Sequence, residues 1–298
     1  MVTVRLGVDI GGTKTDVVVV DDAGHVLHRH VRPTGSGVEE VLANVTSAVD
    51  EVCALVGIRP DGAESIGVGA PGSVVEGVVT YAQNLDIARL DLAYELATRW
   101  GVRPTVDNDV NAAAVGAWVT AGAGKDSIAL LNLGTGLAAG VILDGRLWRG
   151  ARGSVGEIGM ISFDPAGPEG PDGLRGGLET CASGSGISWQ AGGESAESVL
   201  ARADVDADAA LIRDRLFEAV ATAVRVLILT VDVEEVLVGG GLTRMGPGLI
   251  EGARDVMRDW ERRSDFMASL DLTTRTRMLD PDVPLAAIGA AMRGAGRG

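Results

Sequence analysis

Two glycine-rich turns between apolar runs carry residue types that bind phosphate. The first, Gly11-Gly12-Thr13-Lys14, stands between the apolar runs 4–10 and 17–20. Because glycine has no Cβ, such a turn lets backbone N–H groups approach an anion closely. Asp9 ends the first apolar run, where a carboxylate is placed to hold a hydrated Mg²⁺ beside that anion. The structural alternative is a tight hairpin whose glycines only supply a positive φ.

The second turn, Gly134-Thr135-Gly136, repeats this pattern near the middle of the chain. It follows the apolar run 127–133 and precedes another run that ends at Leu143. A further cluster, Gly239-Gly240-Gly241, follows the apolar stretch 235–238. The recurrence of strand, Gly-Thr turn and strand indicates two related halves, each with a glycine-rich turn suited to phosphate.

A polar cluster at residues 107–111 is suited to the chemistry of a hydroxyl acceptor. Asp109 or Asn111 is expected to cap the alanine-rich helix that follows, but capping needs one such residue. The cluster contains four Asp and Asn residues in five positions, which indicates a helix N-terminus that faces a substrate. All three histidines precede residue 31, so a carboxylate is the available general base.

The remaining periodicity predicts the elements that position these turns. Apolar residues at helical spacing predict helices at 38–52, 90–100, 207–231, 248–262 and 284–293, with one more beginning near Ala182. Strands are expected at 26–31, 65–69, 104–107, 127–133, 235–238 and 274–278, with a hairpin over 73–80. Three prolines and five glycines make 163–177 a loop.

Composition limits the class of protein. The chain has 298 residues, of which 46% are hydrophobic, and its net charge of −15 argues against nucleic acid or an anionic membrane as the main partner. It contains no apolar run long enough to span a bilayer. The two cysteines, Cys53 and Cys181, are far apart and are read as reduced thiols of a cytoplasmic protein.

Together these motifs resemble the ROK family (repressors, open reading frames and kinases) of the actin-like ATPase superfamily. The segments 9–15 and 133–140 resemble its two phosphate loops, and Asn108-Asp109-Val110-Asn111 and Gly156-Glu157-Ile158-Gly159 resemble two further family motifs. The resemblance implies an α/β fold with two actin-like (ribonuclease H-like) domains flanking a nucleotide and substrate cleft. The expected domains are 1–118 plus about 284–298, and 119–283.

The resemblance also implies an ATP- and Mg²⁺-dependent kinase and the roles of its residues. Asp109 would be the general base, and Asp9 would hold Mg²⁺ through water. The acceptor would be bound by Asn84, Asn108, Glu157, Met160 and Glu179. ATP and its phosphates would be bound by Asp9, Gly11, Gly12, Thr13, Lys14, Gly134, Thr135, Gly136, Gly240 and Gly241.

The chain departs from the family at its zinc segment. Met160 stands where ROK kinases usually carry a histidine, and Gly170, Asp172 and Gly177 stand at the cysteine positions. Tetrahedral zinc cannot be assembled from these residues, so no zinc is expected. Because the family histidine contacts the acceptor sugar, the acceptor is expected to differ as well.

Several alternatives remain open at this point. The expected acceptor is a hexose, an amino-hexose or a sugar-like polyol, and the alternative is a C7-cyclitol or another modified polyol. Polyphosphate is an alternative donor. A protein of another class, a non-catalytic sugar sensor similar to ROK regulators, is disfavoured because Asp109 is retained and because those regulators carry an N-terminal helix-turn-helix domain, whereas this chain starts at the first phosphate strand. A cytoplasmic homodimer is expected, with no nucleic-acid or membrane partner.

Overall fold

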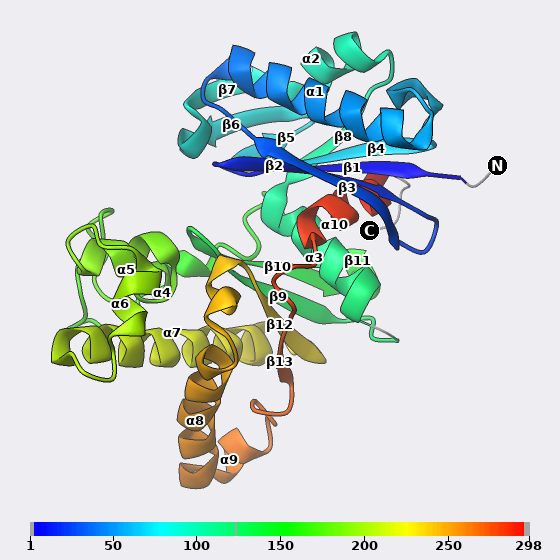
Figure 1. Ribbon diagram of the computed structural model, residues 1–298. Coiled ribbons are helices and arrows are strands. Elements are labelled where there is room, and N and C mark those ends of the chain that lie inside the picture. Colours follow the sequence, from blue (N-terminus) through cyan, green and yellow to red (C-terminus); the bar gives the residue numbers. More distant parts are fainter. Residues whose placement is uncertain (1–2, 123, 295–298) are drawn as a thin grey trace. The chain divides into compact units, whose positions relative to one another are not determined.

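The computed structural model describes residues 3–122 and 124–294 (Figure 1). Contacts divide the chain into two compact units. Unit 1 comprises Met1–Lys125, Asp144–Leu147 and Val283–Gly298, and unit 2 comprises Asp126–Leu143 and Trp148–Asp282. The expected division into domains, 1–118 with about 284–298 and 119–283, stays a prediction.

The sheet of unit 1 brings three strand ends to one edge. Its strand order is β3 (Val26–Pro33), β2 (Lys14–Val20), β1 (Arg5–Ile10), β4 (Ser65–Ala70) and β8 (Thr105–Asn108). Strands β1, β2 and β3 pair antiparallel, whereas β1, β4 and β8 run parallel. The carboxyl ends of β1, β4 and β8 therefore lie at the same edge. In the register, Asp9 lies opposite Asp16 on one side and Gly69 on the other.

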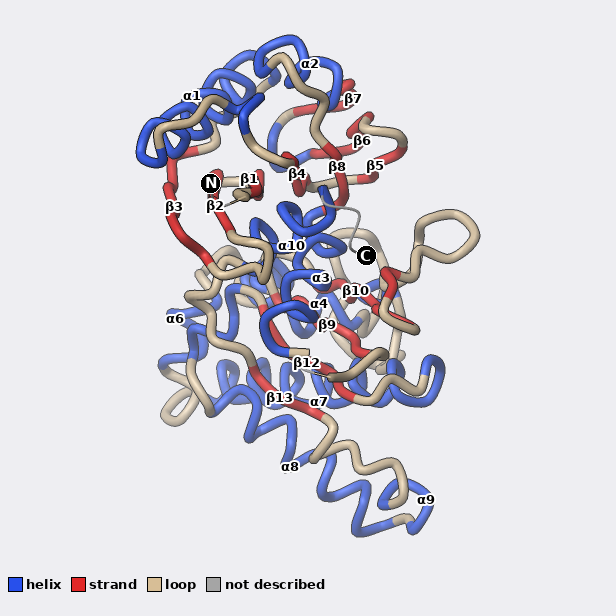
Figure 2. The backbone as a smooth tube through the Cα atoms, turned by 90° about the vertical axis from the view of Figure 1, so that its right-hand side faces the viewer, coloured by secondary structure: helices blue, strands red, loops and turns tan. Residues whose placement is uncertain are grey.

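Helices cover both faces of this sheet. Helices α1 (Val38–Val56) and α2 (Leu92–Trp100) lie on one face, and α3 (Asp109–Ala121) and α10 (Leu285–Gly294) lie on the other (Figures 1 and 2). Leu6 and Val8 belong to the buried core that includes α1 and α2. A Cβ at Gly7 would collide with the Ala287 carbonyl of α10. Since side chains alternate along a strand, Asp9 shares the face of Gly7, toward α3 and α10.

A small second sheet follows β4. The expected hairpin forms strands β5 (Ser73–Val75) and β6 (Val78–Ala82), and the 3₁₀ turn Gln83–Leu85 follows. A third strand, β7 (Ile87–Asp91), was not expected from the sequence, and the helix expected from residue 90 begins at Leu92. The helix was expected to begin two residues early because Leu90 and Ala93, both buried, are three residues apart, a spacing typical of a helix.

The cap of helix α3 also differs from the expectation. Asn108, rather than Asp109 or Asn111, caps the helix: its Oδ1 accepts from the backbone N–H of Val110 at 3.0 Å and of Asn111 at 3.1 Å. Asn108 has the extended backbone of an N-cap residue. Asp109 is therefore the first helical residue, and its carboxylate is not required for capping.

Unit 2 contains a sheet of its own and most of the described helices. Strands β10 (Leu137–Leu143), β9 (Ile128–Leu133), β12 (Glu235–Gly239) and β13 (Thr276–Met278) are neighbours in that order. The helices are α4 (Leu178–Ala182), α5 (Gly184–Gln190), α6 (Ala196–Ala201), α7 (Ala207–Val231), α8 (Gly248–Arg263) and α9 (Asp265–Ala268). The two-residue strand β11 (Arg146–Leu147) belongs to unit 1. The expected helix start near Ala182 is wrong, because α4 ends there and Ser183 caps α5, accepting from Gly186 N at 2.9 Å.

Helix α7 crosses the apolar core of unit 2, with Leu216, Val220 and Leu227 buried along one stripe. Its length of 25 residues does not make it a membrane span. None of the helices in the part of the chain that the structure describes is long and apolar enough to cross a bilayer.

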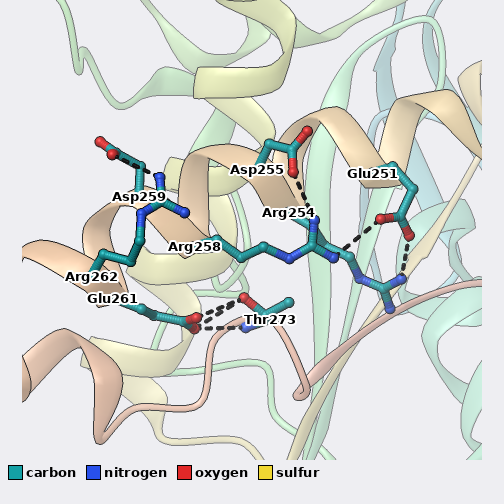
Figure 3. Close-up of polar contacts among 8 residues, drawn as sticks. All are labelled: Glu251, Arg254, Asp255, Arg258, Asp259, Glu261, Arg262 and Thr273. Carbon is teal, nitrogen blue, oxygen red and sulfur yellow. Dashed lines mark hydrogen bonds and ion pairs between the residues drawn. The ribbon is translucent and has the colours of Figure 1, made fainter.

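Ion pairs line the outer surface of helix α8 (Figure 3). Glu251 accepts from both Arg254 and Arg258. Glu261 accepts from the backbone N–H of Thr273 at 3.1 Å, and Arg254 donates to the Thr276 carbonyl of β13 at 2.7 Å. These contacts attach α8 to the edge strand β13, which pairs with β12. They thereby support the strand that ends at the glycine cluster 239–241.

Candidate active site

The first glycine loop (11–14) joins β1 to β2 and is held by a residue that the sequence did not single out. Gly11 N donates to the Lys14 carbonyl at 3.0 Å, which closes the turn. Thr34, which follows β3, donates from Oγ1 to the Gly11 carbonyl at 2.8 Å and from its backbone N–H to the Thr13 carbonyl at 3.1 Å. Thr13 and Lys14 are exposed. No local pattern around Thr34 signals this role, because its partners lie on a different strand pair.

Asn84 lies against this loop. A Cβ placed at Gly12 would lie 3.0 Å from Nδ2 of Asn84, a distance at which the neighbour would have to move. Asn84 itself is exposed on the turn between β6 and β7. A residue expected to bind the acceptor and a loop expected to bind phosphate are thus adjacent.

Asn108 orients the carboxylate of Asp109. Because Asn108 Oδ1 accepts two backbone bonds, its Nδ2 must be the donor, and it donates to Asp109 Oδ1 at 3.0 Å and to the Gly72 carbonyl at 3.1 Å. The backbone N–H of Val110 also donates to Asp109 Oδ1, at 2.9 Å. These four bonds occupy the hydrogen-bonding capacity of the Asn108 amide, so in this geometry the amide serves Asp109 rather than a ligand.

Three carboxylates make the edge of the unit 1 sheet strongly acidic. Burial, as the largest cause, and the negative charges of Asp109 and Asp16 together raise the pKa of Asp9 from its ordinary value of 3.8 to about 8, whereas Lys14 acts in the opposite direction. Asp16 stands opposite Asp9 and is paired with Arg29 at 2.7 Å. Like charges at such positions repel. A hydrated divalent cation beside Asp9 would relieve this repulsion, so the residues present fit Mg²⁺.

The second glycine loop (134–136) joins β9 to β10 in unit 2. Gly134 N donates to the Gly136 carbonyl at 3.0 Å. Glu179, in the first turn of α4, accepts from the backbone N–H of Leu137 at 2.8 Å through Oε2. A Cβ at Gly136 would lie 2.6 Å from the same oxygen. Glu179, expected from the sequence to bind the acceptor, therefore also anchors this loop.

The start of helix α5 supports the other side of the second glycine loop. Gly184 N donates to the Gly134 carbonyl at 2.9 Å, and Ser185 Oγ donates to the Thr135 carbonyl at 2.7 Å. The sequence interpretation did not include these residues. The run Ser183-Gly184-Ser185-Gly186, small and polar at a helix start, is the signal that was available.

The segment around Glu157 and Met160 lies beside Glu179. Glu157 is exposed and precedes the 3₁₀ turn Ile158–Met160, and the Met160 side chain is 51% exposed. A Cβ at Gly159 would collide with the Leu137 carbonyl and would lie 3.1 Å from Cβ of Glu179. The structure thus brings three of the expected acceptor-binding residues together on unit 2.

Gly240 needs to be glycine for two reasons. Its φ of 93° lies in the left-handed region, and a Cβ there would lie 2.5 Å from the carbonyl of Leu133, next to the second glycine loop. Gly241 begins the 3₁₀ turn Gly241–Met245 and has open space where a Cβ would project. Within unit 2, Gly240, which follows β12, therefore lies against the end of β9, next to the second glycine loop.

Comparison with known proteins decides the family. The ROK family profile matches residues 5–276. This chain belongs to the ROK family. The glucokinase of Thermotoga maritima is 34% identical over 283 residues, covering 86% of this chain and 87% of that protein.

Solved ROK structures superpose on nearly the whole ROK chain. A ROK hexokinase from Thermus thermophilus has a TM-score of 0.80 at 26% identity and covers 98% of both chains. A ROK family glucokinase from Streptomyces griseus, in complex with glucose and AMPPNP, has a TM-score of 0.79 at 26% identity, covering 98% of this chain and 99% of that one. The α/β, actin-like fold expected from the sequence is confirmed.

Other relatives of this ROK chain differ in activity. An N-acetylmannosamine kinase from Vibrio cholerae is 29% identical over 255 residues, covering 83% of this chain and 85% of that protein. A xylose repressor from Caldicellulosiruptor bescii is 26% identical over 151 residues, covering 49% of this chain and 38% of that protein. Membership of the ROK family therefore leaves the acceptor to be identified.

We predict that the purified protein contains no stoichiometric zinc. Residues 161–177 contain neither cysteine nor histidine, and the described residues include no group of three or more Cys, His, Asp and Glu side chains arranged to hold a metal. EDTA without added Mg²⁺ should therefore leave the Tm unchanged. Elemental analysis is the measurement, and one zinc per chain would contradict the prediction.

Proposed function

We propose that this ROK-family chain transfers the γ-phosphate of ATP to a hydroxyl group of a hexose or amino-hexose, with Asp109 as the general base. The broader class, an ATP-dependent sugar phosphotransferase of ROK type with an alcohol acceptor, follows from the family and its glucokinase relatives. The observation that carries the assignment of Asp109 is its carboxylate at the edge of β1, β4 and β8, oriented by Asn108.

Asp109 would accept the proton of the acceptor hydroxyl. The acceptor oxygen forms a bond to the γ-phosphorus while the bond from that phosphorus to the leaving oxygen of ADP breaks, and the hydroxyl proton must go to a base. Two donors on Oδ1 hold the Asp109 carboxylate in one orientation. A fixed base saves the entropy of finding the reactive geometry.

The glycine loops and Asp9 would bind the donor. Backbone N–H groups of the loops at 11–14 and 134–136 would contact the phosphates, and Gly240 and Gly241 would leave room for the nucleoside. Asp9 would hold Mg²⁺ through water, and bound Mg²⁺ supplies positive charge that neutralises the transferring phosphate. The raised pKa of Asp9 supports this role, because burial beside the negative charges of Asp109 and Asp16 disfavours its anionic form, and a bound cation would offset that cost.

The side chains expected near the acceptor differ in what they can offer a sugar hydroxyl. Asn84, Glu157 and Glu179 offer amide and carboxylate groups that accept from sugar hydroxyls in fixed directions. Asn108 would act through Asp109, since its amide already makes four bonds within the protein. Met160 offers only a thioether, which is a weak acceptor.

A screen of donors and acceptors tests this function. Coupled ADP release is measured with ATP against hexoses, N-acetyl hexosamines and C7-cyclitols, and phosphorylated product is measured with polyphosphate as donor. ATP-dependent transfer to a hexose or amino-hexose is the expected result. Transfer only to cyclitols would replace the acceptor class. Acceptor binding without any transfer would favour a sugar sensor, the alternative suggested by the xylose repressor relative.

Met160 is expected to make glucose a poor substrate. A hydroxyl buried without its hydrogen-bond partner costs about 1–3 kcal/mol, or roughly one to two decades in kcat/KM. We therefore predict that Met160→His raises kcat/KM for glucose, whereas acceptors with another substituent at that position are used well by the wild type. The measurement is kcat/KM for glucose, mannose, N-acetyl hexosamines, amino sugars and C7-cyclitols with both proteins.

A matched substitution separates this effect from packing. Met257 is fully buried in the core of unit 2, so Met257→Leu changes a thioether away from the exposed segment and should leave the acceptor preference unchanged. If wild-type protein already uses glucose at about 10⁴ M⁻¹s⁻¹ or more, the changed-acceptor prediction fails.

A further inference from the structure

The segment 162–177, here called the clasp, connects two of the expected acceptor-binding residues. It leaves the turn that ends at Met160 and returns to α4 one residue before Leu178. Its ends are closed by the bond from Leu178 N to the Ile161 carbonyl at 2.9 Å and by the bridge between Ser162 and Gly177. The clasp is therefore continuous in sequence with the turn that carries Met160 at one end and with α4, which carries Glu179, at the other.

The clasp is folded on itself by backbone bonds. Phe163 N donates to the Gly176 carbonyl at 2.9 Å, and Gly176 N donates to the Pro168 carbonyl at 2.8 Å. A Cβ at Gly170 would collide with Oγ1 of Thr180, so the clasp lies directly against α4. The same helix carries Glu179, which accepts from Leu137 N beside the second glycine loop.

One side chain outside the clasp holds its outer end. Trp189, on helix α5, donates from Nε1 to the backbone carbonyl of Glu169 at 2.9 Å. The Glu169 side chain pairs with Arg175 at 2.8 Å, but both groups are more than half exposed, and such an exposed pair contributes little. The Trp189 bond is therefore the specific connection between the clasp and helix α5.

Helix α5 connects that bond to the second glycine loop. Ser185 lies four residues before Trp189, on the same face of the helix, and donates to the Thr135 carbonyl at 2.7 Å. A surface pocket lies along this face, lined by Ser185, Ser188, Trp189, Gly192 and Gly193. The clasp is thus bonded to α5, and both α5 and Glu179 of α4 are hydrogen-bonded to residues in or beside the second glycine loop.

We propose that Trp189 is a positioning residue for the acceptor. By attaching the clasp to α5, it holds Met160 and Glu179 in place relative to the second glycine loop. The proposal rests on the proposed function, in which these two residues contact the acceptor. A loop held only at its two chain ends samples more conformations than a loop whose middle is also bonded. Small displacements of positioning groups weaken productive binding.

The test removes the indole N–H group and keeps an aromatic side chain. Trp189→Phe should raise the KM for the acceptor roughly threefold to tenfold, the range expected for one neutral hydrogen bond, with kcat and the KM for ATP nearly unchanged. Trp118→Phe is the matched control, because Trp118 Nε1 donates to the Lys125 carbonyl at 2.8 Å in unit 1. Glu169→Ala keeps the backbone carbonyl and should also resemble wild type.

Hydrogen exchange gives a readout that does not depend on turnover. Peptides covering 162–177 should exchange faster in Trp189→Phe than in wild type, with no change in peptides of helix α3. Trp118→Phe should leave the clasp peptides unchanged. Unchanged exchange of the clasp in Trp189→Phe would overturn the proposal.

The outcomes separate this proposal from the proposed function. If wild type transfers phosphate but Trp189→Phe leaves the acceptor KM unchanged, the proposal is wrong and the function stands. A rise in the KM for ATP instead would show that Trp189 contacts the nucleotide through its pocket, which also overturns it. If wild type transfers phosphate to no acceptor, the proposed function fails. The role of Trp189 is then decided by comparing hydrogen exchange of the clasp and the calorimetric Kd for the acceptor between Trp189→Phe and wild type.

Discussion

Asp109→Asn should lower kcat by roughly 10²–10⁴-fold, the usual contribution of a general base, while the Kd for ATP stays nearly unchanged. The amide keeps the size of the carboxylate but cannot accept the proton of the acceptor hydroxyl. Asn108 donates to Asp109 Oδ1 at 3.0 Å, and an amide oxygen can accept the same bond, so the fold should be retained. Steady-state kinetics and nucleotide binding by calorimetry are the measurements.

Asp91→Asn is the matched control for this substitution. Asp91 also stands at a helix start, where Oδ1 accepts from Tyr94 N at 3.0 Å, and asparagine is an equally good cap. It should leave both kcat and the Tm unchanged. If Asp109→Asn retains more than roughly a tenth of wild-type kcat, the contribution is too small for a general base and Asp109 has another role.

Asp9→Asn is expected to stabilise the protein at pH 8 while lowering its activity. Burial, followed by repulsion from Asp109 and Asp16, raises the pKa of Asp9 from 3.8 to about 8. Between these values the folded state binds more protons than the unfolded state, so stability falls as the pH rises through this window. The difference between these two pKa values corresponds to at most roughly 6 kcal/mol of destabilisation above pH 8.

The pH dependence distinguishes this effect from a general change in packing. The variant should unfold at a higher Tm than wild type at pH 8, and the two should converge as the pH falls below about 4, where Asp9 becomes protonated in the unfolded as well as the folded wild type. Asp50 is an exposed carboxylate on helix α1, so Asp50→Asn should show no such difference. Equal Tm values for Asp9→Asn and wild type at pH 8 would argue against a strained carboxylate at position 9.

Magnesium provides a second check on Asp9. A ligand that binds only the folded state raises stability, so Mg²⁺ should raise the Tm of wild type at pH 8 and have less effect on Asp9→Asn. Asp109→Asn should itself reduce the pH dependence, because the charge of Asp109 is a cause of the raised pKa of Asp9. The two substitutions should therefore not be additive in stability.

The local elements around the site could be predicted from the sequence because they depend on short-range patterns. Helix α7 (Ala207–Val231) has the predicted bounds, since its buried residues recur at helical spacing over its whole length. Strands β1 and β2 and the turn between them follow from two apolar runs separated by Gly-Gly. The Asp and Asn cluster at 107–111 correctly marked the junction of β8 and α3.

Shorter elements with mixed patterns were harder to predict. Leu90 and Asp91, which end strand β7 (Ile87–Asp91), were expected to begin a helix because the buried residues Leu90 and Ala93 are three apart, a spacing typical of a helix. The break between α4 and α5 was missed because Ser183 competes for backbone bonds as a cap, an effect that periodicity does not show. Strand β7 and helix α4 each contain only five residues, which is too short for hydrophobic periodicity to identify the element or its end.

The contacts that position the candidate active site were decided only by the tertiary structure. Asn84 lies against Gly12, Thr34 closes the first glycine loop, and Glu179 bonds to Leu137 N from a residue 42 positions away in sequence. The sequence determined which residue types are available for phosphate binding and proton transfer, because those depend on local chemistry. Which of them meet depends on how distant strands and helices pack, because hydrogen bonds and charge repulsion act through space and not along the chain.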